Sequence, residues 1–408
     1  MRPQKISPLS WTALVVARPA NDVSIAERGS GVAKRMQEGR KMRCERVKEA
    51  PTVPIPVVGL IGCGHIGQFH SRNVRGVLRS ELVPGEYRAV CDRDIERAAG
   101  FAAITGAPVT VGSAGVVFGA PGINTVYICT ETAEHPALVR DAAARGLAIF
   151  CEKPLAKSLA DVESMVVAVE SAGVVNQVGL VLRYSPVFTV IHALMQDDGL
   201  GPLLTAHLRD DQFFPIRGQY ASSWRGDFER AGGGTLLEHS IHDVDLFRWL
   251  FGEVEAVRCH TRNTAGHTGI EDVALVTFQH RGGHQTTLSS VWHACDDRPS
   301  TRRLEVFFEG GYFATDHDFI GPIHWQGRTG EEHVMDVDEV WQRYRDVADL
   351  TADEMALAQR GMLSDYTFLR SVLDDVPAHP DFRTALAAHR VVDACYRSAA
   401  TSAEISLL

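Results

Sequence analysis

The sequence lacks the features that mark zinc-binding, disulfide-rich, nucleic-acid-binding and membrane-spanning proteins. Its 408 residues include eight cysteines, but these form no C-x-x-C pair and no compact even set, a usage that favours a reducing cytoplasm. The formal net charge is −10, and an acidic surface is repelled by nucleic-acid phosphates. No apolar run approaches the ~20 residues that a membrane-spanning helix needs, and no internal repeat or low-complexity tract is present. We therefore expect neither a nucleic-acid nor a membrane partner.

The first fifty residues differ from the rest of the chain. They hold eleven Lys or Arg against five acids and show little periodicity. Trp11–Ala17 is a short apolar run behind Arg2 and Lys5 that faintly resembles a signal-peptide core, but no small-residue cleavage site follows it. We expect residues 1–54 to be a disordered extension and the protein to be cytoplasmic. Met42 is an alternative start of the chain.

From position 57 onward, apolar runs alternate with glycine-containing turns and helical patterns. Such alternation predicts a parallel sheet whose two faces are covered by helices. The predicted strands cover residues 57–62, 87–92, 125–130, 147–154 and 176–181, and the predicted helices cover 66–78, 94–103, 136–145 and 159–171. We assign residues 55–182 to an N-terminal Rossmann domain with a doubly wound parallel sheet.

The pattern changes near position 183, where runs that alternate between apolar and polar residues take over. These runs, with short polar turns between them, predict a mostly antiparallel sheet. They cover residues 254–262, 273–280, 285–292 and 302–310, while helical patterns cover 234–251, 355–373 and 382–398. We assign residues 183–408 to a C-terminal α/β domain built on a large open sheet, with a last helix that packs back on the body of the protein.

A glycine-rich turn follows the first predicted strand. Gly62, Gly64 and Gly67 form G-x-G-x-x-G directly before a helical pattern. The first glycine permits a tight turn, the second lets backbone approach a pyrophosphate, and the third allows close packing of helix on strand. Free N–H groups at the helix N-terminus favour the phosphates. The sequence therefore predicts a dinucleotide site, with His65 and Ile66 inside the same loop.

Asp92 ends the next predicted strand and indicates which dinucleotide binds. A carboxylate at this position accepts hydrogen bonds from the hydroxyls of an adenosine ribose. A 2′-phosphate would meet Asp92 as a like charge, although the neighbouring Arg93 could partly offset the repulsion. The sequence thus predicts NAD rather than NADP. As an alternative, Asp92 could only cap the helix that begins at Asp94.

Three later segments carry a family resemblance. They read CEKPL at residues 151–155, VGLVLRYSP at 178–186 and GGGTLLEHSIHDVDLFRWLFG at 232–252. With the glycine loop before them, they make the chain resemble the Gfo/Idh/MocA oxidoreductase family from about position 57 to the C-terminus. The resemblance implies a Rossmann domain joined to an α/β domain whose open sheet often forms oligomer contacts, hence a homo-oligomer, either a dimer or a tetramer. It also implies that the substrates are mainly sugars, inositols and related polyols.

The resemblance further implies two catalytic residues. Lys153 matches the lysine of the family's E-K-P motif, beside a proline that is often cis, and His242 matches the catalytic histidine. The family's D-x-G-x-H segment departs from its usual form here, because Glu238 replaces the aspartate and Ser240 replaces the glycine. Both changes bear on the identity of the substrate.

Oxidation of a secondary alcohol requires a base near the hydroxyl and a group that stabilises the developing alkoxide. Histidine titrates nearest to neutral pH, so His242 is the candidate base and the Lys153 ammonium the candidate stabiliser. A continuous helix would place Glu238 four residues before His242 on the same face, where its carboxylate orients the imidazole and raises its basicity. Asp245, three residues after His242, is the competing partner.

Further candidates border the predicted cleft. Cofactor contacts are expected from Thr130, His135, Glu152 and Lys153 in addition to the glycine loop, Asp92 and Arg93, and substrate contacts from Lys153, Arg183, Tyr184, Trp224, Arg225, Glu238 and His242. His135 could equally cap the following helix, and the arginines and aromatic residues of the second set could pack the domain junction. The acids and histidines between Glu238 and Asp243 could suggest a metal site, but no distant third ligand is indicated, so no metal is predicted.

Together these features predict an NAD-dependent dehydrogenase that transfers a hydride between the nicotinamide and a hydroxyl or keto carbon of a sugar, inositol or related polyol. Two alternatives stay open. One is an enzyme that retains its NAD through an oxidoreduction between two sugars or a net elimination. The other is an NAD-binding regulatory protein without turnover, which the replacement at Glu238 makes conceivable and the retention of Lys153 and His242 disfavours.

Overall fold

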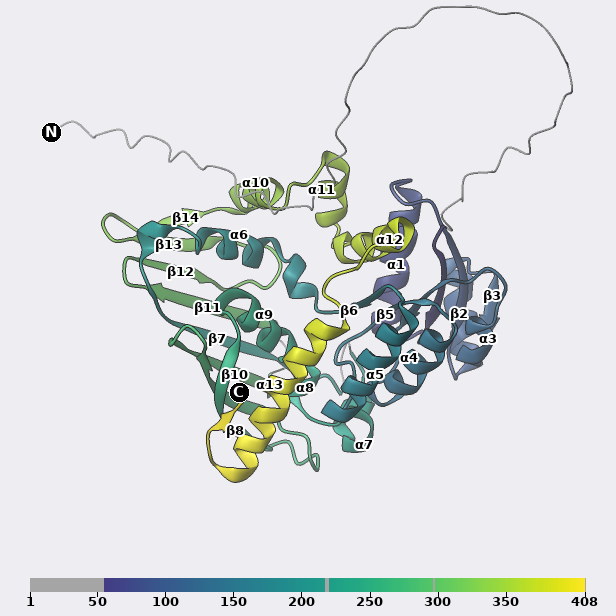
Figure 1. The fold of residues 1–408 in the computed structure, drawn as a ribbon, viewed down its shortest axis with the longest axis horizontal. Helices are drawn as coiled ribbons and strands as arrows, with labels where there is room; N and C mark the ends of the chain where they lie inside the picture. Colours follow the sequence, from purple (N-terminus) through teal and green to yellow (C-terminus); the bar gives the residue numbers. More distant parts are fainter. Residues whose placement is uncertain (1–54, 217–219, 296–297, 408) are drawn as a thin grey trace, which may run out of the picture. The chain divides into compact units, whose positions relative to one another are not determined.

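A computed structural model of the protein describes residues 55–216, 220–295 and 298–407 (Figure 1). The predicted disordered extension, residues 1–54, lies outside these residues. Among the described residues, no helix is long and apolar enough to cross a membrane. Four cysteines that lie near the ends of the parallel strands are buried and free: Cys63, Cys91, Cys129 and Cys151.

The first sheet contains six parallel strands in the order β3-β2-β1-β4-β5-β6, which confirms the predicted doubly wound sheet. Its strands are β1 (Val57–Ile61), β2 (Glu86–Cys91), β3 (Val109–Val111), β4 (Thr125–Ile128), β5 (Ala148–Cys151) and β6 (Asn176–Val178). The helices that alternate with them are α1 (His65–Arg79), α2 (Ile95–Thr105), α3 (Ala114–Phe118), α4 (His135–Ala144) and α5 (Leu159–Ala172). Strand β3 and helix α3 were not predicted, because each is too short to carry a periodic pattern.

Strand β1 shows why these segments are apolar throughout. Val58 and Leu60 belong to one buried apolar cluster, whereas Val57 and Ile61 belong to another. Successive side chains of a strand point to opposite faces of the sheet, so both faces of this sheet are buried. A strand covered on both faces has no polar side, which explains its continuous apolar run.

The carboxyl ends of the parallel strands bring the predicted cofactor residues to one edge of the sheet. Gly62 directly follows β1, Asp92 follows β2 and Glu152 follows β5, while Thr130 lies two residues after β4. Neighbouring parallel strands end on the same side, and this edge is where ligands bind in open α/β sheets.

The second sheet contains nine strands in the order β14-β13-β12-β11-β7-β10-β9-β8-β15. They are β7 (Leu203–Phe213), β8 (Val254–Arg262), β9 (Val273–His280), β10 (Gln285–His293), β11 (Thr301–Phe308), β12 (Gly311–Thr315), β13 (Ile323–Gly327), β14 (His333–Met335) and β15 (Ile405–Ser406). Only β7 and β10 pair in parallel among these, so the predicted mostly antiparallel sheet is confirmed. The four predicted runs became β8 to β11, whereas β7 was missed because Arg209, Asp210 and Asp211 interrupt its apolar pattern.

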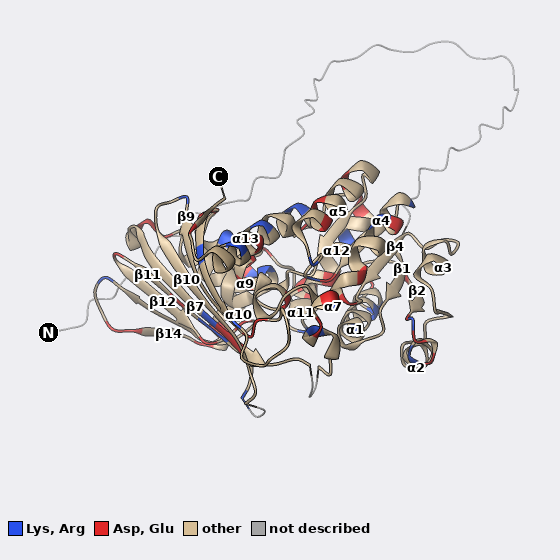
Figure 2. Cartoon of the chain, turned by 90° about the horizontal axis from the view of Figure 1, so that it is seen from below, with Lys and Arg blue, Asp and Glu red and all other residues tan. Residues whose placement is uncertain are grey.

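Helices and short turns complete the second half of the chain. The helices are α6 (Pro186–Leu194), α7 (Phe228–Ala231), α8 (Thr235–Glu238), α9 (Ile241–Phe251), α10 (Val337–Val347), α11 (Ala352–Ala358), α12 (Leu363–Asp374) and α13 (Phe382–Thr401). The 3₁₀ turns are η1 (Thr132–Glu134), η2 (Val181–Tyr184), η3 (Asp198–Leu200) and η4 (Ser223–Gly226). Helices α9 and α13 lie on one side of the nine-stranded sheet (Figure 2), and α13 also contacts α5.

Two of the predicted helices are each broken in two. The pattern over 355–373 becomes α11 and α12, because Gly361 adopts a left-handed φ of +69° between them. The pattern over 234–251 becomes α8 and α9. The second break changes the site, since residues on either side of it no longer share one helix face.

The break between α8 and α9 has a local cause. His239 leaves helical geometry with φ −123° and ψ −63°, and its imidazole contacts Asp210 on β7. Ser240 Oγ donates to Asp210 Oδ2 at 3.0 Å and lies 2.6 Å from Ser290 Oγ on β10. The side chains of His239 and Ser240 thus bind two strands, and the backbone does not continue the helix at this point.

Candidate active site

The glycine loop has the geometry that a bound dinucleotide requires. Gly62 has a φ of +97°, and a Cβ added there would lie 2.5 Å from the carbonyl oxygen of Cys129. A Cβ added at Gly67 would lie 2.0 Å from the carbonyl oxygen of Gly62, so helix α1 packs directly on the turn. A Cβ at Gly64 would instead enter open space, and none of the described side chains caps α1. The N–H groups of the first turn are thus left for a phosphate, and the loop fits the cofactor.

Asp92 is tied to this loop as well as to the following helix. Its Oδ2 accepts from the backbone N–H of Cys63 at 2.9 Å, and its Oδ1 accepts from the N–H of Asp94 at 3.0 Å. The N-terminus of α2 is capped by the Asp94 side chain itself. Capping by Asp92 is therefore not needed, and the carboxylate is held at the mouth of the cleft beside Arg97, 3.5 Å away.

One cleft collects most of the predicted site residues. It is lined by Gly62, Gly64, His65, Ile66, Asp92, Arg93, Thr130, Glu152, Lys153, Trp224, Arg225, Glu238 and His242. The lining residues that the sequence did not indicate as site residues include Gln212, Tyr220, His239 and Trp292. The structure therefore brings the cofactor loop, the E-K-P lysine and the candidate histidine to the same cavity.

Backbone groups position the Lys153 side chain in this cleft. It follows β5, and its peptide bond to Pro154 is cis, as the resemblance implies. Its Nζ donates to the carbonyl oxygen of Glu238 at 2.7 Å. Burial, together with the nearby Arg225 cation, lowers the pKa of Lys153 to about 8. A lysine with this pKa exchanges its proton readily near neutral pH.

His242 lies in the first turn of α9 and is almost fully buried. Its Nδ1 is buried and has no hydrogen-bond partner among the described residues. Burial, reinforced by the positive charges of Lys153 and Arg302, lowers the pKa of His242 well below its usual value. The imidazole is therefore neutral at pH 7.

The predicted pairing of Glu238 with His242 is wrong. Glu238 ends α8, and its carboxylate accepts from the Thr132 hydroxyl at 2.6 Å through Oε1 and from Arg225 Nε at 3.2 Å through Oε2. The break at His239 turns the carboxylate toward these two groups. Glu238 thus joins the turn after β4 to the Arg225 loop, and it does not orient the histidine.

Family comparisons agree with this geometry. Residues 57–180 match the model of the oxidoreductase family with an NAD-binding Rossmann fold, and residues 188–314 match the Gfo/Idh/MocA C-terminal domain. The chain belongs to the Gfo/Idh/MocA oxidoreductase family. The predicted NAD-binding Rossmann domain is thereby confirmed.

Several relatives of this Gfo/Idh/MocA protein are sugar or polyol dehydrogenases. An inositol 2-dehydrogenase of Rhizobium meliloti is 27% identical over 86% of this chain and 98% of its own length. A D-apiose dehydrogenase of Paraburkholderia graminis is 30% identical over 55% of this chain and 57% of its own length. Levoglucosan dehydrogenase in complex with NADH has the same fold, with a TM-score of 0.76 at 19% identity, covering 86% of this chain and 99% of that one.

Arg183 and Tyr184 were predicted to contact substrate in this Gfo/Idh/MocA protein, but they do not line the cleft described above. Asp245 binds both ends of the Arg183 guanidinium, at 2.7 Å and 2.8 Å. The Tyr184 hydroxyl contacts Thr367 and the carbonyl oxygen of His379. These side chains connect η2 to α9 and to the C-terminal segment, and all of these contacts lie within the predicted second domain. Because Asp245 binds Arg183, it is not the partner of His242 either.

His135 lies behind the cleft. Its Nδ1 lies 2.9 Å from the carbonyl oxygen of Pro154, and its Nε2 lies 3.2 Å from that of Thr130. Both ring nitrogens face carbonyl oxygens, so the neutral ring donates its single N–H to one of them, and burial lowers the pKa of His135. The imidazole therefore connects the turn after β4 to the E-K-P turn, and it begins α4 without reaching the cavity.

A buried charged triad supports the E-K-P turn, and no motif in the sequence indicates it. His70 on α1 contacts Glu152 Oε1 through Nε2 and Asp365 Oδ1 on α12 through Nδ1, each at 2.7 Å. The other oxygen of Glu152 accepts from the backbone N–H of Lys153 at 3.1 Å. Burial disfavours the charged imidazole, but the two carboxylates outweigh it and raise the pKa of His70 to about 10. The available sequence signal was polar residues, His70 and Asn73, on the buried side of α1.

Proposed function

We propose that this protein is an NAD-dependent dehydrogenase that acts on a hydroxyl or keto carbon of a sugar, inositol or related polyol. The observation that carries the proposal is that Lys153 and His242 line the same cleft as the glycine loop and Asp92. Relatives named inositol 2-dehydrogenase and D-apiose dehydrogenase support a polyhydroxylated substrate. The nicotinamide, when bound, supplies the acceptor or donor of the hydride.

The side chains divide the proton chemistry between them. A neutral His242 accepts the hydroxyl proton in oxidation and returns it in reduction. The Lys153 ammonium, close to the same oxygen, stabilises developing negative charge. Glu238 keeps the cleft in shape by binding Thr132 and Arg225, and its backbone carbonyl holds the lysine in place.

A panel of inositols, hexoses, pentoses and anhydrosugars tests the reaction. With NAD added, we expect absorbance at the reduced-nicotinamide band to rise for at least one polyol. As a control, the purified protein is denatured and its supernatant is assayed for dinucleotide that stayed bound to the protein during purification. Released dinucleotide without net reduction would favour the retained-cofactor enzyme, and NAD binding without turnover on any panel member would favour the regulatory protein.

We also propose that the protein is a cytoplasmic homo-oligomer, a dimer or a tetramer. The support is the open face of the nine-stranded sheet, where Leu275 is about half exposed and a shallow pocket is lined by residues of β7, β8, β9, β10 and β11. Light scattering coupled to size-exclusion chromatography is expected to give two or four times the 44.6 kDa chain mass. A monomer at micromolar concentration would contradict the proposal.

A further inference from the structure

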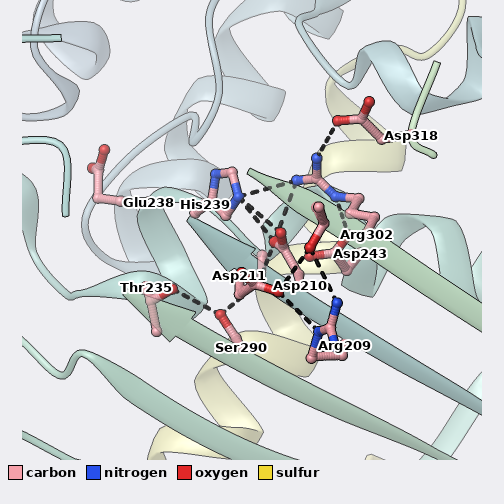
Figure 3. Close-up of polar contacts among 12 residues, drawn as sticks. Arg209, Asp210, Asp211, Thr235, Glu238, His239, Asp243, Ser290, Arg302 and Asp318 are labelled. Atoms are coloured by element: carbon pink, nitrogen blue, oxygen red, sulfur yellow. Dashed lines mark hydrogen bonds and ion pairs between the residues drawn. The ribbon is translucent and has the colours of Figure 1, made fainter. Parts of the chain in front are cut away.

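A second imidazole lines the cleft and is supported differently from His242. His239 belongs to the same cavity wall as Lys153 and His242. It sits in the break between α8 and α9, and its side chain is 14% exposed. Its Nε2 lies 3.1 Å from Asp210 Oδ1 and 3.0 Å from Asp210 Oδ2. No contact of Nδ1 with another described residue accompanies these (Figure 3).

The surroundings of Asp210 determine which nitrogen of His239 carries the proton. Asp210 also accepts from Ser240 Oγ at 3.0 Å and from Arg302 Nη2 at 3.3 Å. A lone pair on Nε2 would face two carboxylate oxygens, whereas an N–H there donates to them. Arg302 Nη2, which carries two N–H groups, lies 3.3 Å from the same Nε2, but the two carboxylate oxygens lie closer to it, at 3.1 Å and 3.0 Å. The geometry therefore favours a proton on Nε2.

The neighbouring charges keep the ring in its neutral form. Lys153, Arg225 and Arg302 are the cations that face His239, Asp210 and Asp243 are the facing carboxylates, and His242 lies beside it. Burial and these cations lower the pKa of His239 well below its usual value. Arg302 is itself shared among Asp210, Asp243 and Asp318 (Figure 3). With Nε2 protonated and the ring neutral, Nδ1 keeps its lone pair.

We propose that His239 Nδ1 is a hydrogen-bond acceptor for a substrate hydroxyl in this cleft and that Asp210 is the positioning residue that fixes the required tautomer. The proposal rests on the proposed polyol dehydrogenase activity. An imidazole oriented by a carboxylate on its far nitrogen is the arrangement that other enzymes use to present a basic nitrogen to a hydroxyl. His242 lacks such a carboxylate, because Glu238 binds elsewhere and points away from this cluster (Figure 3).

Chemical labelling of the folded full-length protein tests the assignment without substrate. Diethyl pyrocarbonate acylates unprotonated imidazole nitrogens, and peptide mass spectrometry reports each histidine separately. We expect His239 to be labelled in the wild-type protein and in Asp211→Asn. In Asp210→Asn, the side-chain amide donates to Nε2 and moves the ring proton to Nδ1, so labelling is expected to slow by about tenfold or more.

Asp211→Asn is the matched control, because it removes a buried carboxylate from the adjacent position of β7. Asp211 binds Arg298 and Thr301 and makes no contact with His239. An unlabelled His239 in wild-type protein, or an unchanged rate in Asp210→Asn, would overturn the proposal. Should Asp210→Asn fail to fold, side-chain ¹⁵N shifts of the wild-type protein decide the tautomer, and a proton on Nδ1 would overturn it.

The contact between His239 and the substrate hydroxyl is tested by a separate measurement. With NADH present, the panel polyol that turns over is expected to slow the labelling of His239, and His239→Leu is expected to raise KM about 3- to 10-fold with a smaller change in kcat. Turnover without protection and without a KM change would overturn the contact. Absence of turnover on every polyol would instead count against the proposed function, while the labelling result still assigns the free nitrogen.

Discussion

Replacing Lys153 by methionine is expected to lower kcat for the reactive polyol by about 10²- to 10⁴-fold, the range found when a proton-transfer group or an oxyanion donor is removed. Methionine keeps the apolar stem and removes the ammonium that lies 2.7 Å from the Glu238 carbonyl oxygen. The affinity for NADH, measured by fluorescence titration, should change by no more than about threefold, because the glycine loop and Asp92 are untouched. Steady-state kinetics on the panel substrate give kcat and KM.

Lys157→Met is the matched control. Lys157 lies four residues further along the same segment, where it contacts Glu229, and it does not line the described cleft. Its replacement is expected to leave kcat near the wild-type value. Equal losses of turnover and of NADH affinity in Lys153→Met would show that the lysine serves binding alone and would contradict the proposed role.

The pH dependence of kcat/KM shows whether the protonated or the deprotonated form of Lys153 is the active one. Because burial and Arg225 lower the pKa of Lys153 to about 8, the ammonium form is lost within an accessible range. If the ammonium stabilises the alkoxide, kcat/KM for oxidation falls as the pH rises through about 8, and this limb disappears in Lys153→Met. A wild-type kcat/KM that rises through the same pH would instead assign the lysine as the base.

The parallel sheet could be predicted because its signals are local. Strand β1 is apolar at every position, and the glycine loop follows it directly. Strand β3 escaped prediction because three half-buried residues carry no periodicity. Strand β7 escaped because Asp210 and Asp211 lie on it for tertiary reasons: Asp210 binds Arg302 on the paired strand β11, and Asp211 binds Arg298, which lies just before that strand. Burial of charge on a strand is a property of the fold that a pattern of hydrophobic residues does not reveal.

The site was only partly predictable because its polar partners are distant in sequence. The glycine loop, Lys153 and His242 follow from the motifs, but Gln212, Tyr220 and Trp292 and the hydrogen bonds of the cleft do not. Glu238 binds Thr132, which is 106 positions away, in preference to the residue four positions further on. The helical pattern over 234–251 gave no warning of the break at His239, because the apolar spacing continues across it. A break that depends on contacts with β7 and β10 is decided by tertiary structure.

Replacing His70 by glutamine is expected to lower the free energy of unfolding by about 3–5 kcal/mol at pH 7, the usual cost of removing one partner from a buried ion pair. The variant leaves Glu152 and Asp365 facing a neutral side chain in a buried site. The wild-type pKa of about 10 lies above the ordinary value of 6.5. The stabilisation is therefore complete below pH 6.5 and is lost as the pH rises toward 10. Chemical denaturation across this range is expected to show that the free energy of unfolding of the wild-type protein falls as the pH rises. In His70→Gln this dependence on pH is expected to be much weaker.

His389→Gln is the matched control for this pH dependence, because His389 is a buried histidine without a carboxylate partner among the described residues. Its Nδ1 donates to the Ala385 carbonyl oxygen at 2.8 Å, and its Nε2 is buried with no hydrogen bond to any residue that the structure describes. Burial lowers the pKa of His389 to about 4. Its contribution is present above pH 6.5 and is lost as the pH falls toward 4, so the variant should change the acid limb and leave the alkaline limb intact. An alkaline limb that persists in His70→Gln would show that the triad with Glu152 and Asp365 is not its source.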